Sequence, residues 1–514
     1  MSGAEAAPAA AAPAVAAYEP VIGVEIHVQL RTVSKMFCAC STDIADAPPN
    51  SRTCPICLGL PGTLPVANRR AVELVLLTGL ALGARILPVT RWDRKNYFYP
   101  DLPKGYQISQ YDLPLTADGR LAFDTTAGPT EVRIRRAHLE EDTARLIHAA
   151  DDAGRRVSLI DFNRSGMPLM EVVTEPDLRS AEAARRYAEE LRLVLLTIRA
   201  SDAALEGGQM RVEANVSLRP AGSEALGTRV EVKNMNSFRA VERAIDFEVE
   251  RQAQVLDGGG AVIQETRGWD DARGVTYTMR RKEDSEDYRY FPEPDLPPLE
   301  TDEAWLRRLR GQLPELPGAR RQRYRDALGL SLYDSAVLVA EPAATALFEG
   351  ALAVDPALPP KAVANWVTGE YLRLAKSLQA EESSADAARA GSGAVEVDPA
   401  QLARLVRLVV DGAISGTNAK QVLERHARSG ESVEAIVAAL GLQQISDRDA
   451  LAALVDEVLA ANPDAVADVR AGKGQALGFL VGQAMKATRG RADAATVQAL
   501  LRERLAAGGA EAST

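Results

Sequence analysis

The sequence predicts an α+β protein: a mixed-sheet cradle domain with a zinc knuckle, followed by a helical domain and an all-α C-terminal tail domain. Three observations lead to this prediction. Strand-like and helical segments rich in turn signals alternate over residues 18–298. All four cysteines lie between Cys38 and Cys57. From about residue 299 onward, the sequence is rich in alanine, leucine and arginine and has helical periodicity.

We expect four segments in the 514 residues. Residues 1–17 form an alanine- and proline-rich disordered leader, 18–298 the cradle, 299–395 the helical domain with its linker, and 396–514 the tail. The leader contains Glu5 and no basic residue, which argues against a secretory signal or a mitochondrial presequence. No apolar run approaches the roughly 20 residues that span a bilayer. We therefore expect a cytoplasmic protein that does not contact a membrane.

The first strand is predicted from Val21 to Leu30, where apolar and polar residues alternate. One face of this strand is apolar, and the other carries Glu25, His27 and Gln29. A carboxylate and an imidazole on one strand face indicate a floor that can hold a metal and an anionic substrate. An antiparallel sheet with one solvated face explains the same pattern, so the strand alone leaves both interpretations open.

The cysteines form two close pairs separated by a loop of 13 residues: Cys38, Cys40, Cys54 and Cys57. Two such pairs provide the four thiolates of a tetrahedral zinc site, which would be structural because it has no open position. Two disulfides or four reduced thiols are the alternative. We favour zinc because a cytoplasmic chain rarely keeps disulfides.

Further carboxylates follow in unusual settings. Glu140 belongs to an acidic stretch after a strand-like segment, and Glu171 is the one charged residue of an otherwise apolar run, residues 167–173. A buried carboxylate is costly unless it is paired or bound to a cation.

A helix is predicted from Ala181 to Ile198, and another begins after Ser237 as its N-cap. Between them, residues 210–219 repeat the alternation of the first strand, with Arg211 and Glu213 on the polar face.

These segments suggest a magnesium site in which Glu171 joins Glu25, His27, Glu140 and Glu213. Carboxylate oxygens are the ligands that Mg²⁺ prefers, and His27 is the least typical member. Spacing alone supports a second interpretation equally well, in which the carboxylates form separate ion pairs with basic residues: Arg164, Arg211 and Lys233.

The charge of the chain indicates its binding partners less clearly than these motifs indicate a metal site. The net charge of −11 does not suggest a nucleic-acid binder, yet arginines cluster at residues 307–325 and basic residues at 486–504. Such runs are commonly solvated helix faces, and contact with RNA phosphates is the alternative. The sequence has no P-loop and no Gly-x-Ser-x-Gly nucleophile motif, so a covalent acyl intermediate on this chain is not expected.

Seven motifs together resemble the GatB/GatE family, which includes the B subunits of aspartyl/glutamyl-tRNA(Asn/Gln) amidotransferases. They stand in the family's order, and the resemblance covers residue 18 to the C-terminus. The matching stretches are residues 23–30, 54–62, 94–101, 104–110, 161–166, 232–238 and 287–295.

The resemblance implies a two-step reaction on a misacylated tRNA, either Glu-tRNA(Gln) or Asp-tRNA(Asn). ATP and Mg²⁺ phosphorylate the side-chain carboxylate, and ammonia then converts it to the amide. The resemblance also implies a heterotrimer with an A subunit, the glutaminase that supplies ammonia, and a small C subunit. The helical region and the tail would bind the tRNA.

The resemblance assigns Glu25, His27, Glu140, Glu171 and Glu213 to the phosphorylation pocket. Lys95 and Glu140 would form a charged gate for ammonia. Contacts with phosphate or carboxylate are expected from Arg164, Lys233 and Asn234. The alternative function is a non-catalytic, zinc-containing scaffold that binds tRNA within a larger complex.

Overall fold

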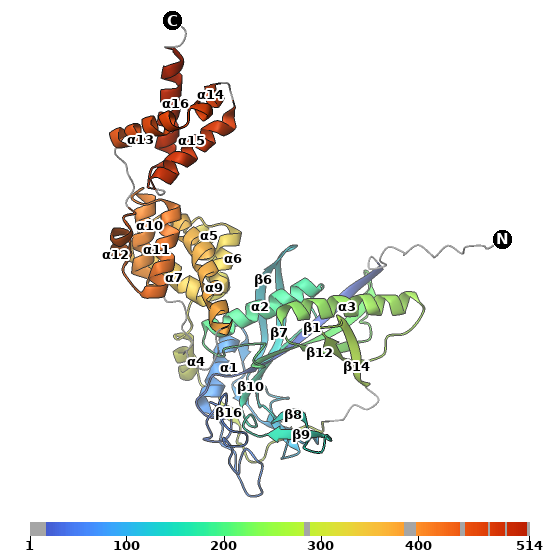
Figure 1. Cartoon of the computed structure of the whole chain (residues 1–514). Coiled ribbons are helices and arrows are strands. Elements are labelled where there is room, and N and C mark those ends of the chain that lie inside the picture. Colours follow the sequence, from blue (N-terminus) through green and yellow to red (C-terminus); the bar gives the residue numbers. More distant parts are fainter. Residues whose placement is uncertain are drawn as a thin grey trace, which may run out of the picture. The chain divides into compact units, whose positions relative to one another are not determined.

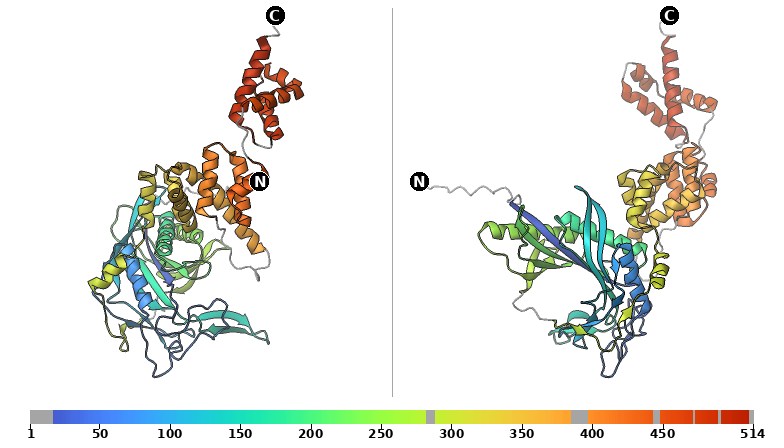
Figure 2. Two further views of the ribbon diagram at one scale, coloured as in Figure 1. Left: turned by 90° about the vertical axis from the view of Figure 1, so that its left-hand side faces the viewer. Right: turned by 180° about the vertical axis from the view of Figure 1, so that it is seen from behind.

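The computed structural model describes residues 17–281, 288–384, 397–442, 448–470, 473–488 and 491–510 (Figures 1 and 2). The expected leader, apart from Ala17, lies outside this part of the chain, as do residues 385–396, which contain most of the linker expected at residues 379–394. The chain divides into two compact units, Met1–Ala319 and Arg320–Thr514.

In the described part of the first unit, nine strands form one sheet in the order β14-β13-β12-β11-β1-β10-β7-β6-β2. Neighbouring strands are antiparallel except β12 and β13, which are parallel, so the sheet is mixed as predicted. The strands are β1 (Tyr18–Gln29), β2 (Arg85–Ile86), β6 (Thr116–Thr125), β7 (Gly128–Glu141), β10 (Pro168–Thr174), β11 (Met210–Pro220), β12 (Val230–Met235), β13 (Glu265–Asp270) and β14 (Val275–Arg281).

The described residues also form smaller sheets that are separate from the nine-stranded one. β4 (Asp93–Asn96) pairs with β5 (Tyr106–Ser109) and with β15 (Phe291–Pro292). β3 (Val89–Thr90) pairs with β16 (Leu299–Glu300), and β8 (Arg145–Ala150) forms a hairpin with β9 (Arg156–Asp161).

Helices cover one face of the large sheet. α1 (Arg69–Ala81) contacts β6 and β7, α2 (Ala181–Thr197) contacts β1 and β6, and α3 (Phe238–Asp257) contacts β11, β12 and β14 (Figure 1). The core between helices and sheet contains the apolar row of β1, including Ile22, Val24 and Ile26. The polar row of β1 therefore faces the side of the sheet that these helices leave uncovered.

Both predicted helices are confirmed, and their N-caps explain where they begin. The hydroxyls of Ser180 and Ser237 accept hydrogen bonds from the backbone N–H groups of Ala183 and Ala240, at 3.1 and 3.0 Å. An oxygen at this position satisfies a donor that has no partner within the helix.

The first unit also contains α4 (Glu303–Arg310), whose Leu306 and Leu309 are buried in the core of the sheet domain. The division between the two units therefore falls after this helix. Trp305 of α4 donates a hydrogen bond from Nε1 to Glu73 of α1 at 3.1 Å.

The second unit is helical in the described residues, which confirms the prediction of a helical C-terminal region. Its first helix, α5 (Pro317–Asp326), begins in the last three residues of the first unit. The next helices, followed by a π-helical segment at Trp366–Tyr371, are α6 (Leu332–Ala340), α7 (Pro342–Val354) and α8 (Pro360–Asn365). The others are α9 (Leu372–Ser384), α10 (Pro399–Val410), α11 (Gly416–Ser429), α12 (Val433–Leu440), α13 (Arg448–Ala461), α14 (Pro463–Arg470), α15 (Gly474–Ala487) and α16 (Ala494–Ala510).

The last four helices share an apolar core that includes Val455, Leu480 and Leu501. Among the described residues, no single helix combines the length and hydrophobicity of a membrane span. One bent pair, α6 with α7, meets the criteria of length and composition when the two are taken together.

Candidate active site

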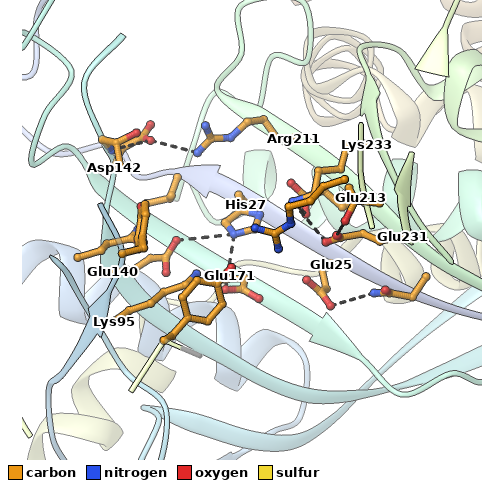
Figure 3. Close-up of a pocket in the computed structure, with 18 of the residues that line it drawn as sticks. Glu25, His27, Lys95, Glu140, Asp142, Glu171, Arg211, Glu213, Glu231 and Lys233 are labelled. Carbon is orange, nitrogen blue, oxygen red and sulfur yellow. Dashed lines mark hydrogen bonds and ion pairs between the residues drawn. The ribbon is translucent and has the colours of Figure 1, made fainter. Parts of the chain in front are cut away.

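A pocket of about 530 Å³ lies on the polar face of the large sheet. β1, β7, β10, β11 and β12 contribute to its wall, and Figure 3 shows their side chains pointing into a common space. The charged groups that line it are Glu25, His27, Lys95, Glu140, Asp142, Glu171, Arg211, Glu213, Arg229, Glu231, Lys233, Glu265 and Arg280.

Strand register explains how distant residues meet here. In the β1–β11 pair, Glu25 lies opposite Glu213 and His27 opposite Arg211. In the β1–β10 pair, His27 lies opposite Glu171. Residues directly opposite each other on one face have Cβ atoms roughly 5 Å apart, so these pairs interact across the strands.

His27 lies between two carboxylates. Its Nε2 is 3.5 Å from Glu171 Oε2 and 3.7 Å from Glu140 Oε1. Burial by itself would lower the pKa of His27, but its contacts with Glu171 and Glu140 raise the pKa to about 9. Burial would likewise raise the pKa of Glu171, and the imidazoles of His138 and His27 instead hold it well below its usual range.

A second group consists of three carboxylates: Glu25, Glu213 and Glu231. Burial and the charges of Glu171, Glu213 and Glu231 raise the pKa of Glu25. Lys233 offsets part of this charge, because its Nζ is 2.9 Å from Glu213 and 3.3 Å from Glu231. The side-chain amide of Asn215 donates to Glu25 at 2.9 Å.

The five residues predicted to form the magnesium site are therefore divided between two neighbouring groups. His27 and Glu140 form one with Glu171, while Glu25 and Glu213 form the other with Glu231. Within each group, one ligand atom from each residue lies within 4.8 Å of the others.

Lys95 enters the pocket from β4. Its Nζ lies 5.0 Å from the ring centre of Tyr288, which also lines the pocket. Burial would lower the pKa of Lys95, but the charge of Glu140 raises it, so the side chain is an ammonium at neutral pH.

Arg164 and Asn234, two of the residues expected to contact phosphate or carboxylate, lie outside the wall of this pocket. Arg164 donates to the backbone carbonyls of Thr143 and Ala144 at 2.9 and 2.7 Å. Asn234 is exposed and donates to the hydroxyl of Tyr277 at 3.3 Å. Lys233, the third expected contact, does line the pocket.

Sequence reasoning missed several residues in and around the site, among them Glu231 and His138. Glu231 lies on β12 between the buried Val230 and Val232, and the same alternation that identified β1 could have identified it. His138 lies behind the pocket beside Glu140 and Glu171. Its position depends on the pairing of β7 with β10, which no local pattern reveals.

The four cysteines lie together in the knuckle loop, which we define as residues 35–57. Sγ of Cys57 is 3.5 Å from that of Cys54 and 3.7 Å from those of Cys38 and Cys40. The ammonium of the fully buried Lys35 is 3.7 Å from the same sulfur. A hydrogen bond from Cys38 and the charge of Lys35 lower the pKa of Cys57.

The pocket has the properties of a site for a cation and an anionic ligand. Among the described residues that line it there is no serine or cysteine, so nucleophiles of these two types are missing from its wall. Nδ1 of His27 is buried and has no hydrogen-bond partner among the described residues, and two further carboxylates, Glu213 and Glu231, lie beside Glu25. An unpaired imidazole nitrogen and clustered carboxylates fit a bound divalent cation.

Comparison with known proteins identifies the family. Residues 20–307 match the GatB/GatE catalytic domain, and residues 346–505 match the GatB domain. The chain is 51% identical to the B subunit of the aspartyl/glutamyl-tRNA(Asn/Gln) amidotransferase of Moorella thermoacetica over 488 residues, which are 95% of this chain and 100% of that protein.

B subunits of the same name from other bacteria are similarly close. The one from Roseiflexus sp. is 49% identical over 95% of this chain and 98% of its own length. The one from Anaeromyxobacter sp. strain K is 50% identical over 95% of this chain and 99% of its own length. The resemblance carried by the seven motifs is thereby confirmed, and the chain belongs to the GatB/GatE family.

Proposed function

We propose that this chain is the subunit of a glutamine-dependent tRNA amidotransferase that carries the phosphorylation and amidation pocket. Its substrate is a misacylated tRNA, Glu-tRNA(Gln) or Asp-tRNA(Asn). The observation that supports this most strongly is one pocket on one sheet face, lined by Glu25, His27, Glu140, Glu171, Glu213 and Lys95. The names of the relatives support the reaction class.

The proposed reaction has two balanced steps. The side-chain carboxylate of the esterified amino acid attacks the terminal phosphorus of ATP, which gives an acyl phosphate and ADP. Ammonia then attacks the acyl carbon, phosphate leaves, and a carboxylate of the pocket takes the proton from nitrogen. Phosphoryl transfer depends on positioning and charge neutralisation, so a pocket without serine or cysteine suits it.

Carboxylates of both acidic groups would hold Mg²⁺: Glu140 with His27, and Glu25 with Glu213. When bound, the cation neutralises charge on the phosphates of ATP. Lys233 and Arg211 present cationic groups to the same space for phosphate or carboxylate. Arg164 lies outside the wall and would support it through Asp142. Its Nε is 3.7 Å from the Asp142 carboxylate, and that carboxylate is 3.2 Å from the guanidinium of Arg211.

For ammonia we propose a passage that enters at Lys95 and Glu140. Lys95 is half-buried and Glu140 is buried. The two carry opposite charges in the same wall, and each shifts the pKa of the other toward its charged form. The ammonia would come from a glutaminase A subunit, with a small C subunit completing a heterotrimer in the cytoplasm, where aminoacyl-tRNAs are used. Residues 396–514 would bind the tRNA.

The pocket assignment is tested by Glu140→Gln in a complex reconstituted with the A and C subunits. Gln keeps the shape of the side chain but loses its charge, so ATP-dependent amide formation should fall at least a hundredfold. Glutaminase activity and tRNA affinity should remain within about twofold. The matched control is Glu131→Gln, which changes an exposed glutamate of the same strand.

If Glu140→Gln amidates as fast as the unmodified complex, the chemistry occurs elsewhere and the chain is a non-catalytic tRNA-binding scaffold. A loss of tRNA binding in step with activity also supports the scaffold. Loss of amidation with intact binding and glutaminase activity supports the enzyme.

We also propose that Cys38, Cys40, Cys54 and Cys57 hold a structural zinc ion. A tetrahedral zinc ion with bonds of about 2.3 Å keeps its sulfur ligands about 3.8 Å apart. The separations of 3.5 and 3.7 Å around Cys57 agree with this value. The ammonium of Lys35 offsets part of the negative charge of four thiolates.

Elemental analysis of the purified chain should therefore find about one zinc ion per molecule. Cys54→Ser should lose it, while Ser41→Ala, in the same loop, should retain it. A chain that folds normally with no zinc contradicts the proposal.

A further inference from the structure

A row of alternating imidazole and carboxylate side chains crosses three adjacent strands. His27 on β1 lies opposite Glu171 on β10, which in turn lies opposite His138 on β7. His138 is 2% exposed and does not line the pocket, so bound substrate cannot touch it. The two residues that it contacts, Glu140 and Glu171, do line the pocket.

A hydrogen bond to His138 determines which of its nitrogens carries the proton. Nε of Arg136 donates to His138 Nδ1 at 3.2 Å. The guanidinium nitrogen always carries hydrogen, so Nδ1 must accept and the ring proton lies on Nε2. Nε2 is 3.3 Å from Glu171 Oε2 and 3.8 Å from Glu140 Oε2.

These contacts fix one oxygen of each carboxylate. His138 lies against Oε2 of Glu171, and Oε2 of Glu140 accepts a hydrogen bond from the Ser109 hydroxyl at 3.1 Å while also facing His138. Oε1 of Glu140 remains on the side of His27, at 3.7 Å from its Nε2. Hydrogen bonds to ligating carboxylates commonly set their orientation and change metal affinity by about 10- to 100-fold.

We propose that His138 is a positioning residue: with its tautomer set by Arg136, it directs its Nε2–H at Oε2 of Glu171, faces Oε2 of Glu140, and so orients both carboxylates to bind a divalent cation. This inference rests on the proposed function of the pocket as a cation site. It assigns His138 no contact with substrate and no transfer of a proton.

Two substitutions separate hydrogen bonding from packing. The amide nitrogen of His138→Gln can take the place of Nε2, whereas the shorter His138→Asn can take only the place of Nδ1 and accept from Arg136. The probe is Mn²⁺, titrated into the full-length chain and followed by the electron paramagnetic resonance signal of the free ion.

His138→Asn should weaken Mn²⁺ binding at least tenfold, and His138→Gln should bind within about threefold of the unmodified chain. In the reconstituted complex, His138→Asn should raise the Mg²⁺ concentration for half-maximal amidation. Its kcat at saturating Mg²⁺ should stay within a few fold. The matched control is His148→Asn, an exposed histidine of the β8–β9 hairpin.

Equal Mn²⁺ affinity in the unmodified chain and His138→Asn overturns the role of His138 and leaves the proposed function intact. Equal loss in the Asn and Gln variants also overturns it, because a donated hydrogen bond is then not what matters. If the unmodified chain binds no Mn²⁺, the proposed cation site fails and this inference fails with it.

Discussion

His27 shows how its neighbours change the chemistry of a single side chain. Its half-buried imidazole lies between Glu140 and Glu171, which together raise its pKa from 6.5 to about 9. In the unfolded chain this pairing is absent. The protonated imidazole therefore stabilises the fold at pH values below about 6.5, and this contribution is lost as the pH rises through 9.

We predict that the free energy of unfolding falls between pH 6.5 and 9 in Mg²⁺-free buffer. A pKa shift of this size corresponds to at most about 3 kcal/mol. His27→Gln should remove this part of the pH dependence, and His148→Gln, at an exposed site, should not. Urea denaturation at several pH values measures both. The same slope in the unmodified protein and in His27→Gln would contradict the pairing.

Asn234 illustrates why single residues are harder to place than strands. Its neighbours Val232 and Lys233 follow the alternation of β12, and Lys233 reaches the pocket. Asn234 has a positive φ of 64°, which asparagine tolerates better than most residues, and its side chain lies on the exposed surface. A motif placed Lys233 and Asn234 together, whereas strand geometry separates them.

At the scale of elements, β1 is the most informative strand. Its apolar row is buried against the helices, with Ile26 completely inaccessible to solvent, and its polar row forms the floor of the pocket. Because the side chains alternate, a shift in register of one residue would bury Glu25 and His27 and expose the apolar row. Packing of the apolar row thus sets the position of the site.

Ile26→Ala should lower the free energy of unfolding of the sheet unit by about 2–5 kcal/mol, because it leaves a cavity in a well-packed core. Val33→Ala is the control, since Val33 is 90% exposed and its truncation should change stability by less than about 0.5 kcal/mol. Urea denaturation followed by tryptophan fluorescence measures both. A loss of under 1 kcal/mol for Ile26→Ala would show that the row is not tightly packed.

Local sequence patterns predicted individual strands and helices well, but they did not predict which strands pair with one another. β1, β11, α2 and α3 follow from periodicity and N-caps, which depend on residues close in the sequence. The order β11-β1-β10-β7 depends on pairings between distant segments, and no single sequence pattern contains it. β1 pairs with β10 and β11, which lie more than 100 positions further along the chain. Two acidic groups, rather than one set of ligands, are the consequence of this order.

At the scale of the whole molecule, the two basic clusters, residues 307–325 and 486–504, differ in the ion pairs that their side chains form. In α4 and α5, Arg310 pairs with Glu303, Arg308 with Glu73 and Arg323 with Glu349, which agrees with solvated helix faces. In the tail, Lys486 and Arg502 are exposed and Arg504 pairs with Asp456, while Arg489 lies outside the described residues. The tail is the better candidate for contact with tRNA phosphates.

Removal of residues 396–514 from the reconstituted complex should therefore weaken tRNA binding at least tenfold. Glutaminase activity should stay unchanged, because we assign it to the A subunit, and the pocket and the cysteines of this chain lie in the other unit. Phosphate contacts release counterions, so the affinity of the complete complex should fall as salt rises, and the truncated complex should show a shallower dependence. Filter binding at several salt concentrations measures both. If the truncated complex binds tRNA as tightly and with the same salt dependence, the tail does not contact the tRNA backbone.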